Sequence, residues 1–205
     1  MKVSYLHISC PALFLACAAF ASGCSGTGSL RDESPYLLIE SADFGEMHNV
    51  SRMGPIWFGA MPAGGDLDLA CRRGIQRVID LSSANEKAEC QMAATCAQLE
   101  MEFFIAGIRP EGEPTDESVD LVLGWLLESV GPAVGASAGG SKRDAIPTLM
   151  IDGSGGRSAT FLAIFRVVHL GVPLQVALEE ARRGGMIPGT SEDFVRAQVK
   201  RLAAK

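Results

Sequence analysis

The sequence predicts an α/β fold, with a central and mostly parallel sheet of four to five strands flanked by helices. Short apolar runs that fit buried strands alternate with longer runs that fit helices. Glycine and proline separate many of these runs, at the points where elements end. The chain has 205 residues, of which 47% are hydrophobic, so one globular domain with short appendages is expected and disorder throughout is excluded.

The first predicted elements follow from apolar runs and their stop signals. Residues 56–58 (IWF) form a short strand, and residues 67–73 form a brief helix that Gly74 ends. Residues 77–81 (RVIDL) are typical of a buried strand. The amphipathic pattern that follows predicts a long helix over residues 86–99.

The middle of the chain continues this alternation. Residues 102–105 (EFFI) predict a strand, and a loop separates it from a helix over residues 116–130. Asp116 and Glu117 favour the start of this helix because acidic side chains complement the helix dipole there. Residues 131–146 are rich in Gly, Ala and Ser and poor in large apolar groups, so we interpret them as a flexible surface insertion.

The last predicted strand, residues 147–151, runs through a glycine-rich turn into a helix over residues 157–170. Proline opens a further helix over residues 173–184. Ser191 is the expected cap of a C-terminal helix over residues 191–205, docked at the edge of the domain. Strands that alternate with helices imply parallel connections, and function in such sheets lies beyond the carboxyl ends of the strands.

The charge balance and the cysteines argue against several ligands. With 18 basic and 24 acidic side chains the net charge is -6, so a nucleic-acid partner is not expected. The sequence holds no Cys-x-x-Cys motif or Cys/His cluster, so we expect no metal site and no cofactor. Beyond the N-terminal region, Cys71, Cys90 and Cys96 can form one disulfide at most, and we interpret them as small buried hydrophobes.

The N-terminal segment predicts a lipoprotein signal peptide over residues 1–23. Its apolar centre, residues 12–21, is half as long as a bilayer-spanning helix and fits a signal-peptide core. The segment Ala21-Ser22-Gly23-Cys24 resembles a bacterial lipobox, which implies that Cys24 is lipidated and becomes the mature N-terminus. An ordinary secretory signal cut near Gly23 is the alternative.

The polar residues that follow, 24–35, predict a tether between the membrane and a domain over residues 36–190. Ser25, by resemblance to lipoproteins of Gram-negative bacteria, favours the outer membrane. We therefore expect the protein in the cell envelope, anchored to a membrane through Cys24 and facing the periplasm or the exterior.

The most informative stretch is residues 148–160 (TLMIDGSGGRSAT), a buried strand followed by a tight turn and a helix. Such a turn aims successive backbone N–H groups and a helix N-terminus at one point, which is the geometry of an anion-binding loop. Arg157 adds a planar fork suited to phosphate. A plain strand-to-helix turn, with glycines for close packing, is the alternative. The candidate loop residues are Gly153, Ser154, Gly155 and Gly156.

Residues 48–190 resemble the cysteine-dependent tyrosine and dual-specificity phosphatase superfamily. The resemblance rests on the turn above and on the stretches HNVSR (48–52), WFGAMP (57–62) and RGIQRVIDL (73–81). The bacterial subgroup named beta-lactamase-hydrolase-like, or DSP/PTPase fused to NAD kinase-like, places four residues between its cysteine and arginine. Asp152 and Arg157 reproduce that spacing, and Ser158 follows as in the subgroup. The resemblance implies a tyrosine-phosphatase-like fold.

The sequence departs from this pattern at the nucleophile. The position of the cysteine is Asp152, and the histidine that usually precedes it is Ile151. In the family a thiolate attacks phosphorus, and a carboxylate within about 4 Å of a phosphate instead costs on the order of 1 to 4 kcal/mol. We expect Asp152 to bind the loop N–H groups and to pair with Arg157, which would neutralise the loop.

The general acid of the family lies after the third strand, where Glu111, Glu113 and Asp116 stand. Glu111 and Glu113 also fit solvated loop charges, and Asp116 also fits a role at the helix start.

Three hypotheses follow. The first is a membrane-tethered pseudophosphatase that acts as a binding or regulatory module for a protein partner or a phosphorylated ligand. The second is an active phosphohydrolase that uses Asp152 as nucleophile, with Mg²⁺ held by further carboxylates such as Asp80. The third is a structural lipoprotein. We favour the first because the nucleophilic cysteine is absent.

Overall fold

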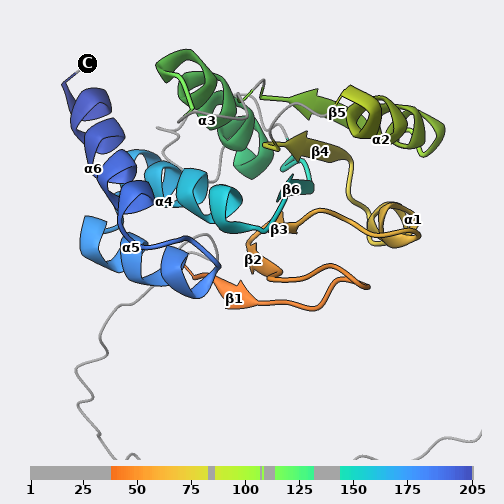
Figure 1. Ribbon diagram of the computed structural model, residues 1–205, viewed down its shortest axis with the longest axis horizontal. Coiled ribbons are helices and arrows are strands. Elements are labelled where there is room, and N and C mark those ends of the chain that lie inside the picture. Colours follow the sequence, from red (N-terminus) through yellow and green to blue (C-terminus); the bar gives the residue numbers. More distant parts are fainter. Residues whose placement is uncertain (1–37, 83–85, 107, 109–113, 132–143, 205) are drawn as a thin grey trace, which may run out of the picture. The chain divides into compact units, whose positions relative to one another are not determined.

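The computed structural model describes residues 38–82, 86–106, 108, 114–131 and 144–204 (Figure 1). The expected signal peptide (1–23), the tether (24–35) and most of the expected insertion (131–146) lie outside the described residues. Within the described part of the chain, no helix is long and apolar enough to cross a membrane.

Six strands of the described residues form one sheet, in the order β1-β2-β3-β6-β4-β5. The strands are β1 (Glu40–Ser41), β2 (Ser51–Met53), β3 (Ile56–Ala60), β4 (Arg77–Asp80), β5 (Glu102–Ile105) and β6 (Thr148–Asp152). Strands β3, β6, β4 and β5 run parallel, whereas β1 and β2 pair antiparallel at one edge. The predicted α/β fold is confirmed, but the expected strand number is too low, because β1 and β2 are too short to give a period-2 pattern.

The helices of the described residues lie where the sequence predicts them, within a residue or two. They are α1 (Asp66–Arg72), α2 (Glu86–Gln98), α3 (Asp116–Val130), α4 (Gly156–Leu170), α5 (Leu174–Arg183) and α6 (Thr190–Ala203). The predicted cap of the last helix is wrong. Gly189 occupies the N-cap position of α6 without a side-chain bond, and Ser191 lies inside the first turn.

The core forms two layers, one on each face of the sheet. Along β6, Met150 faces the layer of α3 to α6, whereas Leu149 and Ile151 face the layer of α1 and α2. Because strand side chains alternate, β6 is buried on both faces, as expected of a central parallel strand. Figure 1 shows α4 running from the end of β6 between α3 and α5. Helix α4 is buried over most of its length and holds the loop before it in place.

Three parallel strands end together at the edge of the sheet that carries the glycine turn. Ala60 of β3 lies beside Asp152 of β6, and Asp80 of β4 lies beside Ile151. The turn after Asp152 therefore leaves the centre of the sheet, flanked by the ends of β3 and β4. This is the edge at which parallel sheets place their ligand sites.

The two ends of the expected insertion lie close together. The N–H of Ile146 donates to the carbonyl oxygen of Ser129 at 2.9 Å. The hydroxyl groups of Ser129 and Thr148 are 2.7 Å apart, and both residues are fully buried. The chain thus leaves and re-enters the domain at one place.

Candidate functional site

The glycines of the turn are required by its close contacts. Gly155 has a left-handed φ of 88° and is the N-cap of α4. A Cβ on Gly155 would lie 3.1 Å from the carbonyl carbon of Gly59, and a Cβ on Gly156 would lie 2.7 Å from the carbonyl oxygen of Gly185. The turn is therefore packed between the end of β3 and the turn that follows α5.

Asn49 holds the turn from a third side. Its side-chain Nδ2 donates to the carbonyl oxygen of Ser154 at 2.9 Å. Asn49 itself has a φ of 54°, a left-handed conformation that asparagine tolerates better than most residues. The sequence analysis quoted Asn49 only within the stretch 48–52. Its role at the turn depends on a contact between residues 105 positions apart, which no local pattern reveals.

Asp152 fills the loop with its own carboxylate. The residue is 3% exposed. Its Oδ1 accepts hydrogen bonds from the N–H groups of Ser154 at 3.0 Å and Gly155 at 2.9 Å, and its Oδ2 accepts one from Ser158 at 2.6 Å. Bonds between a carboxylate and backbone N–H groups are charge-assisted, and the nearby N-terminus of α4 favours the negative charge further. The expected binding of Asp152 to the loop is present in the structure.

Arg157 does not pair with Asp152, so that part of the expectation is wrong. The guanidinium Nη1 donates instead to the carbonyl oxygen of Leu81, just after β4, at 2.6 Å. The reason is geometric. The short carboxylate of Asp152 turns into its own loop, whereas Arg157 lies in the first turn of α4 and reaches across to the next strand end.

Ser158 brings a buried hydroxyl to the base of the loop. The residue is fully buried, and its Oγ has no hydrogen-bond partner among the described residues. Its N–H is the donor to Oδ2 of Asp152. Ser158 therefore contacts Asp152 through its backbone and not through its hydroxyl.

Asp80 does not help Asp152 as a second metal-binding carboxylate. Asp80 is 1% exposed. Its Oδ1 accepts from the N–H of Ser82 at 2.7 Å and from the Ser82 hydroxyl at 2.5 Å, so the carboxylate closes its own turn. Among the described residues, no group of three or more His, Cys, Asp or Glu could hold a metal ion.

Of the candidate general acids, Glu111 and Glu113 lie outside the described residues. Asp116 is described and contacts α6. Its Oδ1 accepts from Gln198 at 2.9 Å and lies 3.2 Å from Nε of Arg201. These contacts give Asp116 a structural role at the junction of α3 and α6, in addition to its place at the start of α3.

The cysteines whose side chains are described lie on α1 and α2, in the layer opposite α4. Cys96 is fully buried, and burial raises the pKa of its thiol to about 11. Cys71 is half-buried, and its Sγ lies 3.7 Å from the carbonyl oxygen of Leu99. The side chain of Cys90 lies outside the described residues. Neither Cys71 nor Cys96 belongs to the loop.

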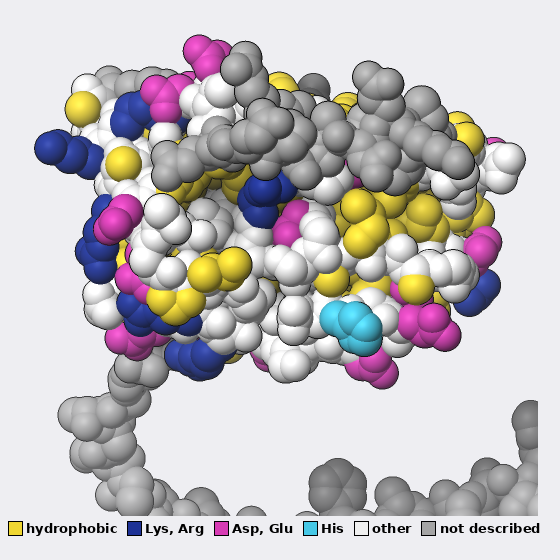
Figure 2. Space-filling model, in the orientation of Figure 1, with side chains coloured by type: hydrophobic (Ala, Val, Ile, Leu, Met, Phe, Trp, Pro, Cys, Tyr) yellow, Lys and Arg dark blue, Asp and Glu magenta, His cyan; other side chains and the backbone are white. Residues whose placement is uncertain are grey.

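Opposite charges are mixed over α5 and α6. Figure 2 shows basic and acidic side chains next to each other at this end of the molecule. Arg182 and Glu192 form an ion pair at 2.6 Å, and Arg201 pairs with Asp120 at the same distance. The bond to Arg182 lowers the pKa of Glu192. This visible face does not form the continuous basic track that a nucleic-acid partner requires.

Solved structures with a similar fold are phosphatases. Tk-PTP matches with a TM-score of 0.60 and 22% sequence identity, over 80% of this chain and 98% of that chain. TpbA from P. aeruginosa, in complex with pTyr, matches with a TM-score of 0.58 and 21% identity, over 84% and 99%. The core catalytic domain of the PP-IP phosphatase SIW14 from S. cerevisiae matches with a TM-score of 0.56 and 16% identity, over 77% and 92%. No protein-family model and no curated protein matches the chain.

These similarities confirm the fold that the sequence motifs predict. The chain has the fold of the cysteine-dependent tyrosine and dual-specificity phosphatases. Within that fold, the strand-to-helix turn with Arg157 begins at Asp152.

Proposed function

We propose that this protein is a membrane-tethered pseudophosphatase, a phosphatase-like domain that binds or regulates a partner without hydrolysing phosphate esters. One observation carries the proposal. The carboxylate of Asp152 accepts three backbone N–H bonds from its own turn and helix start, so the anion site is filled by the chain itself. The substitution of Asp for the superfamily cysteine, and the subgroup assignment, are parts of this proposal.

The chemistry of Asp152 supports the absence of turnover. A carboxylate oxygen that attacks phosphorus must first give up the N–H bonds that hold it, and those same N–H groups are the donors an incoming phosphate needs. The phosphate would also approach a negative charge, which at about 4 Å costs on the order of 1 to 4 kcal/mol. Mg²⁺ could offset that repulsion, but Asp80 is engaged by Ser82.

The binding role would use the surface around the turn. Gly153 and Ser154 are exposed, whereas Gly155 and Gly156 are buried beneath them. TpbA from P. aeruginosa has been solved with pTyr, so a related loop in that protein accommodates a phosphorylated side chain. In the present chain, we propose that a protein partner or a phosphorylated ligand contacts this exposed part of the turn and leaves Asp152 in place.

The tether is a separate part of the proposal. Lipidation of Cys24 would anchor the chain to a membrane of the cell envelope, with the outer membrane favoured by Ser25. If residues 24–35 are fully extended they span at most about 40 Å. The domain would therefore act only on partners that lie close to the same membrane.

A phosphatase assay tests the proposal. The purified protein is expected to hydrolyse an aryl phosphate no faster than the uncatalysed background, with or without Mg²⁺. If the wild type shows Mg²⁺-dependent turnover that Asp152→Asn abolishes, the protein is instead a phosphohydrolase that uses Asp152. Arg72→Ala, a change on α1 away from the turn, serves as the control for preparation quality.

A further inference from the structure

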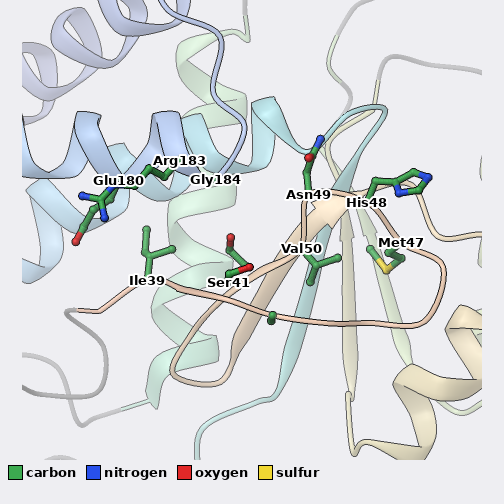
Figure 3. Close-up of a pocket in the computed structure, with 11 residues that line it drawn as sticks. Ile39, Ser41, Met47, His48, Asn49, Val50, Glu180, Arg183 and Gly184 are labelled. Carbon is green, nitrogen blue, oxygen red and sulfur yellow. The ribbon is translucent and has the colours of Figure 1, made fainter.

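A second cavity lies beside the turn, between the β1–β2 edge of the sheet and the C-terminal end of α5 (Figure 3). We call it the α5 pocket. Its volume is about 570 Å³, which is in the range of small-molecule sites. Ile39 and Val50 supply apolar wall, and Arg183 and Gly184 lie across from Ile39 and Ser41. The pocket is thus an apolar wall opposed by a cationic helix end.

Several polar side chains of the α5 pocket have no partner within the protein. Among the described residues, Ser41, Ser51 and Arg183 make no side-chain hydrogen bond or ion pair. Ser51 is only 7% exposed, so its hydroxyl has little access to bulk water. Polar groups that converge on a cavity without partners are typical of sites that bind a ligand.

The charge of the α5 pocket is positive. Glu180 also lines the cavity, but its Oε2 accepts from Nη1 of Arg166, a residue that is 1% exposed. That pair cancels its own charge and leaves the guanidinium of Arg183 as the unpaired ion. The His48 imidazole points away from the other labelled groups in Figure 3 and adds no charge among them. A negative group is the complement of this arrangement.

We propose that the α5 pocket binds a small molecule that carries an oxyanion and hydroxyl groups. Arg183 binds the oxyanion through its planar fork. The hydroxyl groups of Ser41 and Ser51, which both donate and accept, bind the hydroxyl groups of the ligand. Carboxylate and phosphate share this chemistry, and the two arms of the experiment below distinguish them.

The α5 pocket is joined to the turn by two of its own walls. Asn49 lines the pocket and donates to the carbonyl oxygen of Ser154. Gly184 lines the pocket as well, and the next residue, Gly185, is packed against Gly156 so closely that no Cβ fits between them. A ligand that orders these walls therefore also orders the turn that holds Asp152.

Calorimetric titration of the full-length protein with citrate, and separately with inorganic phosphate, tests the site. We expect at least one probe to bind with a millimolar Kd, and the probe that binds identifies the oxyanion. Arg183→Ala should weaken binding about tenfold or more, since it removes a charge-assisted contact. Arg72→Ala on α1 makes the same change in charge without touching the pocket and should leave binding unchanged.

Three results overturn the proposal. They are the absence of binding of either probe at tens of millimolar, an equal loss in Arg72→Ala, and a loss in Arg157→Ala without one in Arg183→Ala. The last result would place the anion in the turn and would also contradict the proposal that Asp152 fills it. The first two would leave that proposal intact.

Hydrogen exchange tests the coupling. Saturating citrate or phosphate, whichever binds, should slow exchange of the backbone N–H groups of residues 154–158 in the wild type. Asn49→Ala removes the bond to Ser154 and should reduce that slowing while binding changes less than about threefold. Equal slowing in Asn49→Ala, or none in the wild type, overturns the coupling.

Discussion

Replacement of Asp152 by alanine is expected to convert the filled turn into an open anion site. The substitution removes one negative charge and frees the N–H groups of Ser154, Gly155 and Ser158. Each of these groups then points at a space where a phosphate oxygen can take the place of a carboxylate oxygen. Arg157 remains nearby, and its guanidinium can leave the carbonyl of Leu81 for the phosphate.

The gain in affinity follows from the charge that is removed. Repulsion between a phosphate and the Asp152 carboxylate at about 4 Å is on the order of 1 to 4 kcal/mol. About 1.4 kcal/mol corresponds to a tenfold change in Kd, so phosphate should bind Asp152→Ala about tenfold or more tightly than the wild type. Asp152→Asn removes the charge but keeps one acceptor oxygen in the turn, and its affinity should lie between the two.

The same substitution should destabilise the ligand-free protein. Ser154 is exposed, so water can replace the lost acceptor there, but Gly155 and Ser158 are buried. An unsatisfied buried N–H costs about 1 to 3 kcal/mol, so we expect a loss of about 2 to 4 kcal/mol in the free energy of unfolding. That loss lowers the melting temperature by roughly 5 to 10 °C. Phosphate at a hundred times its Kd should return about 2.7 kcal/mol.

Calorimetry and thermal denaturation with inorganic phosphate measure both effects. All titrations are made in the Arg183→Ala background, which removes any contribution from the α5 pocket. Adding Arg157→Ala to Asp152→Ala should abolish the gained affinity. The reasoning is refuted if the Asp152-containing protein binds phosphate as tightly as Asp152→Ala, or if the gain persists without Arg157.

Further predictions concern the N-terminus, the insertion, the cysteines and one histidine. Cys24→Ala should abolish the incorporation of labelled palmitate. Deletion of residues 133–144 should change the free energy of unfolding by about 1 kcal/mol or less, because the ends of the insertion already meet and loop closure depends weakly on length. Cys96 should resist alkylation at pH 8 until the protein unfolds, since burial raises the pKa of its thiol to about 11. Burial lowers the pKa of His169, so the neutral form is favoured by folding; the stability it contributes is complete above about pH 6.5 and is lost as the pH falls, and His169→Gln should flatten that loss.

Each of these predictions has a contrary outcome. Palmitate incorporation that persists in Cys24→Ala contradicts lipidation at that residue. A fall of ten degrees in melting temperature after the deletion would show that the insertion packs against the domain. Alkylation of Cys96 as fast as that of the half-buried Cys71 would contradict its burial. An unchanged stability profile between about pH 7 and 5 in His169→Gln would show that His169 does not titrate differently in the folded state.

The sequence predicted the elements that have a strong local pattern. Strands β3 to β6 and all six described helices were found, because each has an apolar run of the correct period with a stop signal. β1 and β2 were missed. They are two and three residues long, and their pairing depends on the antiparallel register of Glu40 with Arg52 and of Arg52 with Trp57. Such short strands are stabilised by their neighbours and leave no periodic signal of their own.

The site was predictable where it is local and not where it depends on tertiary contacts. The spacing from Asp152 to Ser158 identified the turn and the N–H groups that hold the carboxylate. The partner of Arg157 was wrong, because Leu81 is 76 residues away and a backbone carbonyl leaves no trace in the sequence. The support from Asn49 was missed for the same reason.

The position of Asp152 follows from what the turn requires. A strand that ends in a glycine turn and a helix gathers N–H groups at one point, and a buried helix start without an acceptor is unstable. Any chain with this turn therefore needs an anion there, supplied either by a ligand or by a side chain. Here the acceptor is a residue that is 3% exposed and part of β6 itself. The turn can then remain folded without a ligand, and a ligand must displace Asp152 to enter. For this reason the arrangement favours a stable binding surface over a site that fills and empties with each turnover.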